Sequence, residues 1–138
     1  MCSAQWMDLI DESGAFSDLF GRTLKVSDFR LIYVHIDERN TGVTLGFELA
    51  RLPDRPPAQW VRKGFNASQF LFRFAQVTRL GIENWCGFSG AREPHVTLSR
   101  DHTGLLHVML AAGDETMSFH AATARLAEHR AFLASSSW

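Results

Sequence analysis

The residues of this chain that could do chemistry are six histidines, two cysteines and scattered acids and serines. Four of the histidines fall on or near predicted strands, where two or three of them could converge in space: His35, His95, His107 and His120. None of them forms an HxH, HExxH or Cys-His cluster with the spacing of metal ligands. The sequence therefore predicts no metal site and no cofactor.

A catalytic nucleophile would need a serine or cysteine beside a histidine and an orienting group. Ser89 lies in the run Gly87-Phe88-Ser89-Gly90, which lacks the GxSxG spacing of a nucleophile elbow. Cys86 follows Trp85 and is more typical of a small buried residue than of a reactive thiol. Acidic residues fall mainly in predicted turns, where solvation explains them, so no catalytic carboxylate pair is identified. We predict a protein that is not an enzyme.

Basic residues cluster around a proline-rich segment, with Phe65 among them: Arg51, Arg55, Arg62 and Lys63. Basic side chains interleaved with aromatic ones can hold nucleic acid. However, the net charge is −1, and Trp60 and Phe65 are more typical of buried anchors. We predict neither a nucleic-acid nor a membrane partner.

Acidic residues form the candidate surface for a protein partner: Asp8, Asp11, Glu12, Asp18, Asp37 and Glu38. The first four share the polar face of a predicted helical leader at residues 5–20, where no basic residue occurs. The two turn acids would extend this patch if the first hairpin lies alongside. The simpler interpretation is a solvated helix face. The sharper hypothesis is a contact surface that steers a basic partner.

The elements that must position these residues are mostly strands. Apolar and polar residues alternate over 29–36 and 43–49 around a polar turn, which predicts a hairpin. The alternation of Phe70, Phe72 and Phe74 predicts a central strand. Further strands are expected near Ile82, Leu98, Val108 and Phe119. About seven to eight strands predict a mostly β (α+β) protein, an antiparallel sandwich or bent sheet with an N-terminal helix over one edge or open face.

A proline-rich segment, residues 52–60, divides the chain. Three prolines in five residues predict an extended connector and exclude a helix. We expect Trp60 at its end to anchor it on the strand that carries Phe70. The 138 residues fit one domain, 1–138, with a β-rich body at 29–133.

The cysteines and the N-terminus bear on location. Cys2 and Cys86 lie far apart with no CxxC spacing, which predicts two reduced thiols. No signal peptide and no membrane span of about 20 apolar residues is recognised. We predict a cytoplasmic protein.

Several segments resemble the immunity protein 50 family: Val34-His35-Ile36-Asp37, Val43-Thr44-Leu45-Gly46-Phe47, Leu52-Pro53-Asp54-Arg55-Pro56-Pro57 with Trp60, then Trp85 and Phe119-His120-Ala121-Ala122. The resemblance covers roughly Trp6 to Phe132. It implies a mostly β bacterial protein of polymorphic toxin systems, which binds and neutralises a cognate toxin in the cytoplasm. It implies no cofactor and no catalytic residues, and it does not name the toxin. A basic, nuclease-type toxin would suit the acidic surface.

Some alternatives stay open. Residues 123–133 favour a helix by propensity, whereas the family's pattern implies an extended segment, which we prefer. A ligand-binding sandwich would need a cavity, which the Phe-rich core argues against. A subunit of an obligate oligomer would need an apolar patch, which Tyr33 or Leu71 could supply. A hydrolase would need a convergent triad. Neither the oligomeric state nor a role for Cys2 or Cys86 is predicted.

Overall fold

The computed structural model describes residues 29–84 and 95–134. This part of the chain contains eight strands and one short helix. The mostly β class and the predicted number of strands are therefore confirmed. The expected N-terminal helix, the acids Asp8, Asp11, Glu12 and Asp18, and both cysteines lie outside the described residues.

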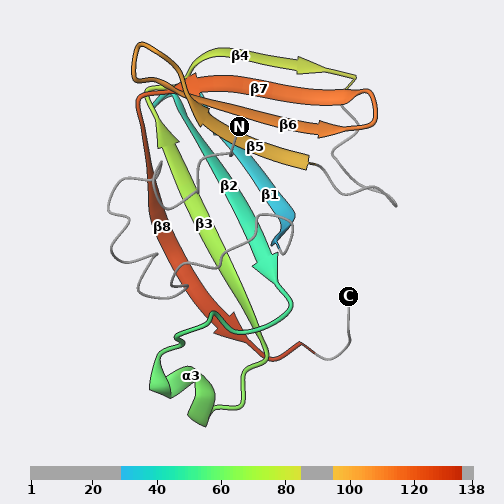
Figure 1. Cartoon of the computed structure of the whole chain (residues 1–138), viewed down its shortest axis with the longest axis vertical. Helices are drawn as coiled ribbons and strands as arrows, with labels where there is room; N and C mark the ends of the chain where they lie inside the picture. Colours follow the sequence, from blue (N-terminus) through green and yellow to red (C-terminus); the bar gives the residue numbers. More distant parts are fainter. Residues whose placement is uncertain (1–28, 85–94, 135–138) are drawn as a thin grey trace.

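The eight strands form two antiparallel sheets of four strands each (Figure 1). Sheet A has the order β1-β2-β3-β8 and consists of β1 (Phe29–Asp37), β2 (Gly42–Leu49), β3 (Ala67–Ala75) and β8 (Thr123–Phe132). Sheet B has the order β4-β7-β6-β5 and consists of β4 (Thr78–Glu83), β5 (His95–Arg100), β6 (Leu106–Ala112) and β7 (Glu115–Ala121).

Strand pairing in sheet A confirms three expectations from the sequence. The first hairpin forms between β1 and β2, with Val34 opposite Leu45. The Phe-rich strand β3 is central, because β2 pairs on one side of it and β8 on the other. Residues 123–132 are extended rather than helical, with Leu126 opposite Phe72. Pairing with a buried central strand here outweighs the helix propensity of the Ala, Leu, Arg and Glu residues in this segment.

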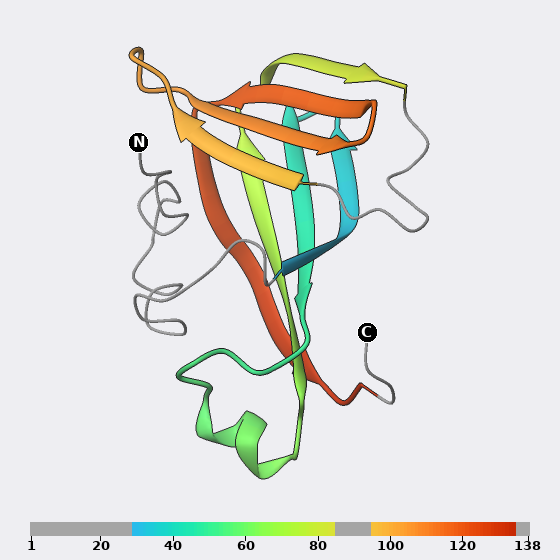
Figure 2. The same ribbon diagram turned by 45° about the vertical axis from the view of Figure 1, so that its right-hand side comes forward.

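The two sheets meet at a corner where the chain passes twice from one to the other. β3 leads into β4 through Gln76 and Val77, and Gln76 has a left-handed φ of +53°. Beside it, β7 leads into β8 through Ala122, whose N–H donates to the carbonyl of Ala75 at 3.0 Å. The strands of sheet B consequently run across those of sheet A and cover only part of it (Figure 2). A face-to-face sandwich is not confirmed.

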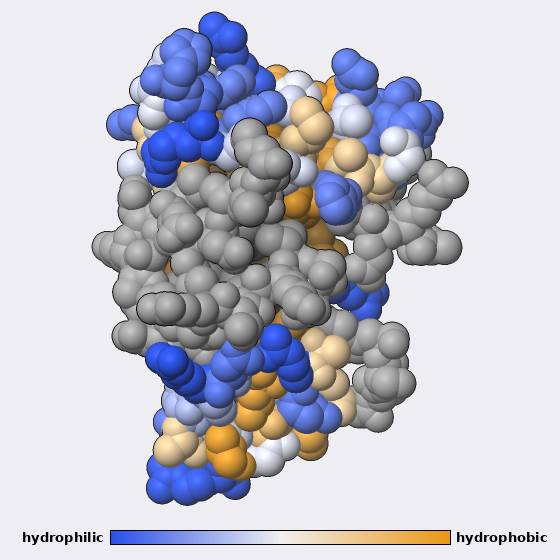
Figure 3. Space-filling view, viewed as in Figure 1, coloured by the Kyte–Doolittle hydropathy of each residue, from blue (hydrophilic) through white to orange (hydrophobic). Residues whose placement is uncertain are grey.

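The hydrophobic core lies where the two sheets face each other. Phe74 of sheet A and Phe119 of sheet B meet edge to face, with ring centroids 5.4 Å apart, and both are buried. Phe47 and Phe72 form a second pair at 5.9 Å. Such pairs contribute about 0.5–1.5 kcal/mol beyond their burial. On the face shown in Figure 3, hydrophilic side chains gather at the upper and lower ends, and apolar side chains are visible in places between them.

The proline-rich segment ends in a helix, α3 (Ala58–Arg62), which directly follows Pro57. The expectation that residues 52–60 exclude a helix is therefore wrong for the last three of them. Proline is tolerated at a helix start because no intrahelical N–H donor is needed there. Trp60 is half-buried and contacts sheet A through β8, where its ring meets His129 edge-on at 5.6 Å. It reaches Phe70 of β3 only indirectly, because His129 in turn stacks on Phe70 at 6.5 Å.

Gly46 allows the side chains of Tyr33 and Leu71 to approach β2 closely on the face of sheet A opposite the core. A Cβ atom at this position would lie 2.8 Å from the Leu71 Cδ2 atom and 2.8 Å from the Tyr33 Cβ atom. Real Cβ atoms do not approach other atoms so closely. Because residue 46 has no side chain, Tyr33 of β1 and Leu71 of β3 can close over β2 between them.

We expect Phe72→Ala to lower the free energy of unfolding by about 3–5 kcal/mol, because it empties a fully buried site. Trp60→Ala should cost less, since it removes a half-buried ring and one aromatic contact of about 0.5–1.5 kcal/mol. Urea denaturation measures both. An equal loss for the two variants would show that Trp60 belongs to the core.

We expect Gly46→Ala to destabilise the fold by about 1–3 kcal/mol, because Tyr33 and Leu71 must both shift. Gly81→Ala is the matched control: Gly81 also lies in a strand, but a Cβ there meets nothing within 4 Å. Thermal unfolding should separate the two variants. Equal melting temperatures would contradict the close approach at Gly46.

Candidate functional site

Two of the predicted partner-binding acids, Asp37 and Glu38, begin the turn between β1 and β2. The carboxylate of Asp37 organises this turn: it accepts the N–H groups of Arg39 at 3.1 Å and Asn40 at 3.3 Å, and the Asn40 side-chain amide at 3.0 Å. The guanidinium of Arg73 lies 3.8 Å away. Asn40, through its side chain and then its backbone, holds the pKa of Asp37 below its usual value, against a smaller opposing effect of desolvation.

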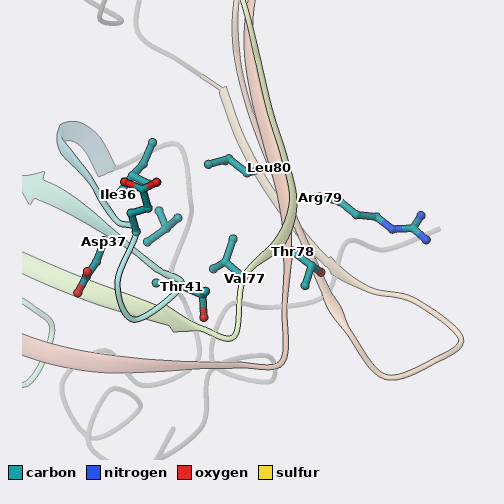
Figure 4. Close-up of a pocket in the computed structure, with 10 residues that line it drawn as sticks. Ile36, Asp37, Thr41, Val77, Thr78, Arg79 and Leu80 are labelled. Carbon is teal, nitrogen blue, oxygen red and sulfur yellow. The ribbon is translucent and has the colours of Figure 1, made fainter.

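An apolar pocket of about 260 Å³ lies beside these acids, between the hairpin and the corner. In Figure 4, Val77 and Leu80 point into the space between β4 and the hairpin, whereas Arg79 points away. Ile36 lines the hairpin side, and both it and Leu80 are about two-fifths exposed, at 41% and 39%. An apolar depression with carboxylates on its rim is suited to receive a side chain of a partner protein.

A second hollow, a groove of about 330 Å³, lies on the face of sheet A opposite the core. It is lined by Ile32, Tyr33, Gln69, Leu71, Glu128 and Arg130. Tyr33 is 45% exposed although it packs beside Gly46. The structure thus brings together the two residues, Tyr33 and Leu71, that the sequence suggested for an apolar patch.

Two of the four strand histidines converge, and the other two lie elsewhere. His107 and His120 lie opposite each other on β6 and β7 with their rings stacked at 4.8 Å, but His35 lies in the other sheet and His95 pairs with Ala111. Within residues 29–84 and 95–134, no group of three or more His, Cys, Asp or Glu side chains could hold a metal ion. Ser89 and Cys86 lie outside those residues.

Over the part of the chain that the structure describes, no helix is long and apolar enough to cross a membrane.

Nothing in the sequence singled out Val77 and Leu80, because the pocket depends on how the corner places β4 next to the hairpin. The outer face of sheet A was also missed as a charged surface. Its composition depends on the pairing of β3 with β8, which are distant in sequence. If residues 123–132 are taken as a strand, their polar positions indicate which side chains would lie on this outer face.

The acids Asp8, Asp11, Glu12 and Asp18 lie outside the described residues, so their proximity to Asp37 and Glu38 stays a prediction. Among known proteins, a family model described as immunity protein 50 matches residues 12–130. No curated protein and no solved structure matches the chain. The match includes the hairpin, the corner and the groove, and on this basis the chain belongs to the immunity protein 50 family.

Proposed function

We propose that this chain is an immunity protein, which binds a cognate toxin of a bacterial polymorphic toxin system and neutralises it by contact. The observation that carries this proposal is the family match over residues 12–130. The protein would act in the cytoplasm of the producing cell, without catalysis and without a cofactor.

The β1–β2 turn and its pocket are the proposed contact for a basic part of the toxin. Glu38 is exposed and forms no hydrogen bond or ion pair within the described residues. Asp37 is held in place by the turn, so little further ordering is needed when a cation binds. The pocket beside them would receive the aliphatic part of a lysine or arginine, or a neighbouring apolar side chain.

The other acids, Asp8, Asp11, Glu12 and Asp18, belong to the same proposal as the remainder of a negatively charged surface. Such a surface raises the rate of association with a basic partner more than it changes the affinity of the final complex. A nuclease-type toxin, whose substrate is an anion, would present the complementary positive charge.

The first test is whether the chain protects against a toxin. The toxin domain encoded beside this chain should arrest growth of a bacterial host, and co-expression of the chain should restore growth. The purified proteins should form a stable complex. Lack of any complex, with both proteins folded, would contradict the proposed function.

Charge reversal then tests the turn. Glu38→Lys should slow association with the toxin by about tenfold at low salt and weaken its dependence on salt, because the steering charge has changed sign. Asp114→Lys is the matched control: it makes the same charge change at an exposed site in the β6–β7 turn. Association kinetics at low and high salt measure the effect. Equal rates for the two variants would exclude the turn from the interface.

A further inference from the structure

Arginines gather on the outer face of sheet A, the face that carries the groove. Arg73 and Arg125 lie directly opposite each other on β3 and β8. Like charges in this position weaken strand pairing. Asp37 lies near Arg73, at 3.8 Å, but Arg125 forms no ion pair within the described residues. Arg125 therefore carries a positive charge that no ion pair within the described residues neutralises, although Glu128 and Glu48 lie on the same face.

A third arginine on this face, Arg130, is held in position. Its Nε–H donates to the Oε1 atom of Gln69, on the neighbouring strand, at 2.6 Å. The two terminal nitrogens of the guanidinium have no further partner among the described residues, and their geometry suits a carboxylate bound side by side. Because Gln69 already orients the group, less freedom is lost when a partner binds.

The groove adds an apolar centre to this charged face. Tyr33 and Leu71 border it over Gly46, Ile32 extends it on the β1 side, and Arg130 closes it on the β8 side. Tyrosine and arginine around a pocket are the residues that dominate binding energy at protein interfaces. The charge and the hollow therefore point to one type of ligand, a protein surface with both acidic and apolar groups.

We infer that the outer face of sheet A docks an acidic patch of the toxin, which places carboxylates on Arg125 and Arg130 and an apolar side chain in the groove. This inference rests on the proposed function and names a second contact of the same partner. The toxin would then be basic where it meets the β1–β2 turn and acidic where it meets sheet A.

Two other occupants fit less well. Glu128 lies between the arginines of β8 and Glu48 lies on the same face, so the continuous line of phosphates of a nucleic acid would pass close to both carboxylates. A protein can instead place single carboxylates on the arginines and none beside the two glutamates. A second copy of this chain, related by a two-fold axis, would bring the same arginine-bearing face against itself. A protein with carboxylates around an apolar side chain satisfies both parts of the surface.

The test uses the purified toxin domain encoded beside this chain and measures its dissociation constant by calorimetry. Arg125→Glu combined with Arg130→Glu should weaken binding by at least about tenfold, and so should Tyr33→Ala alone. Controls on α3 are Arg62→Glu and Val61→Ala, both at exposed positions, which should change the constant by less than about twofold. Arg125→Glu by itself should keep or raise the melting temperature, because it replaces a like-charge pair by an attractive one.

The possible results distinguish a failure of the sheet A contact from a failure of the proposed immunity function. Unchanged affinity in the arginine and Tyr33 variants, with tight binding by the unaltered chain, would overturn this inference and leave the proposed function intact. No binding by the unaltered chain would contradict both. A dimer that Tyr33→Ala converts to a monomer would assign the groove to a second copy. Binding of an RNA or DNA oligonucleotide that is lost in the double arginine variant would assign the face to nucleic acid. Either result overturns the inference.

Discussion

The bend between the two sheets constrains every other feature of the described structure. Two chain crossings lie side by side there, and the N–H of Ala122 in one donates to the carbonyl of Ala75 in the other. The bend brings Phe74 of sheet A against Phe119 of sheet B, so that apolar burial, the main favourable term in folding, stabilises the corner. It also fixes the first hairpin, because the N–H of Val77 donates to the carbonyl of Thr41 at 2.8 Å.

Both candidate surfaces follow from this bend. The pocket beside Glu38 exists because β4 leaves the corner next to the hairpin, and the groove is open because sheet B covers the other face of sheet A. Asp37 and Arg73 connect them: the acid borders the pocket, and the arginine lies on the face that carries the groove. A toxin that contacts both surfaces would meet negative charge at the pocket and positive charge at the groove. Such a pattern favours one partner and repels others with different charge placement.

The sequence predicted local structure better than it predicted pairing between distant segments. Alternation around a polar turn was sufficient for the β1–β2 hairpin, and three alternating phenylalanines for a central β3. Composition alone favoured a helix for β8, because the partner strand that stabilises it is distant in sequence. The short helix α3 was not predicted, because the prolines before it indicated an extended segment. The opposition of Arg73 and Arg125 required the register of β3 with β8, including an irregularity after Leu71, which no sequence pattern reveals.

Hydrogen exchange of the backbone amides, with and without the toxin, tests most directly whether sheet A and its hairpin form the toxin-binding side. We expect slower exchange on binding in β1, in the β1–β2 turn and in β8, with β5 and β6 unchanged. β1 and β8 are the edge strands of sheet A, so their amides are suited to report a partner on that side. Protection confined to β5 and β6, in a complex of normal affinity, would contradict the account.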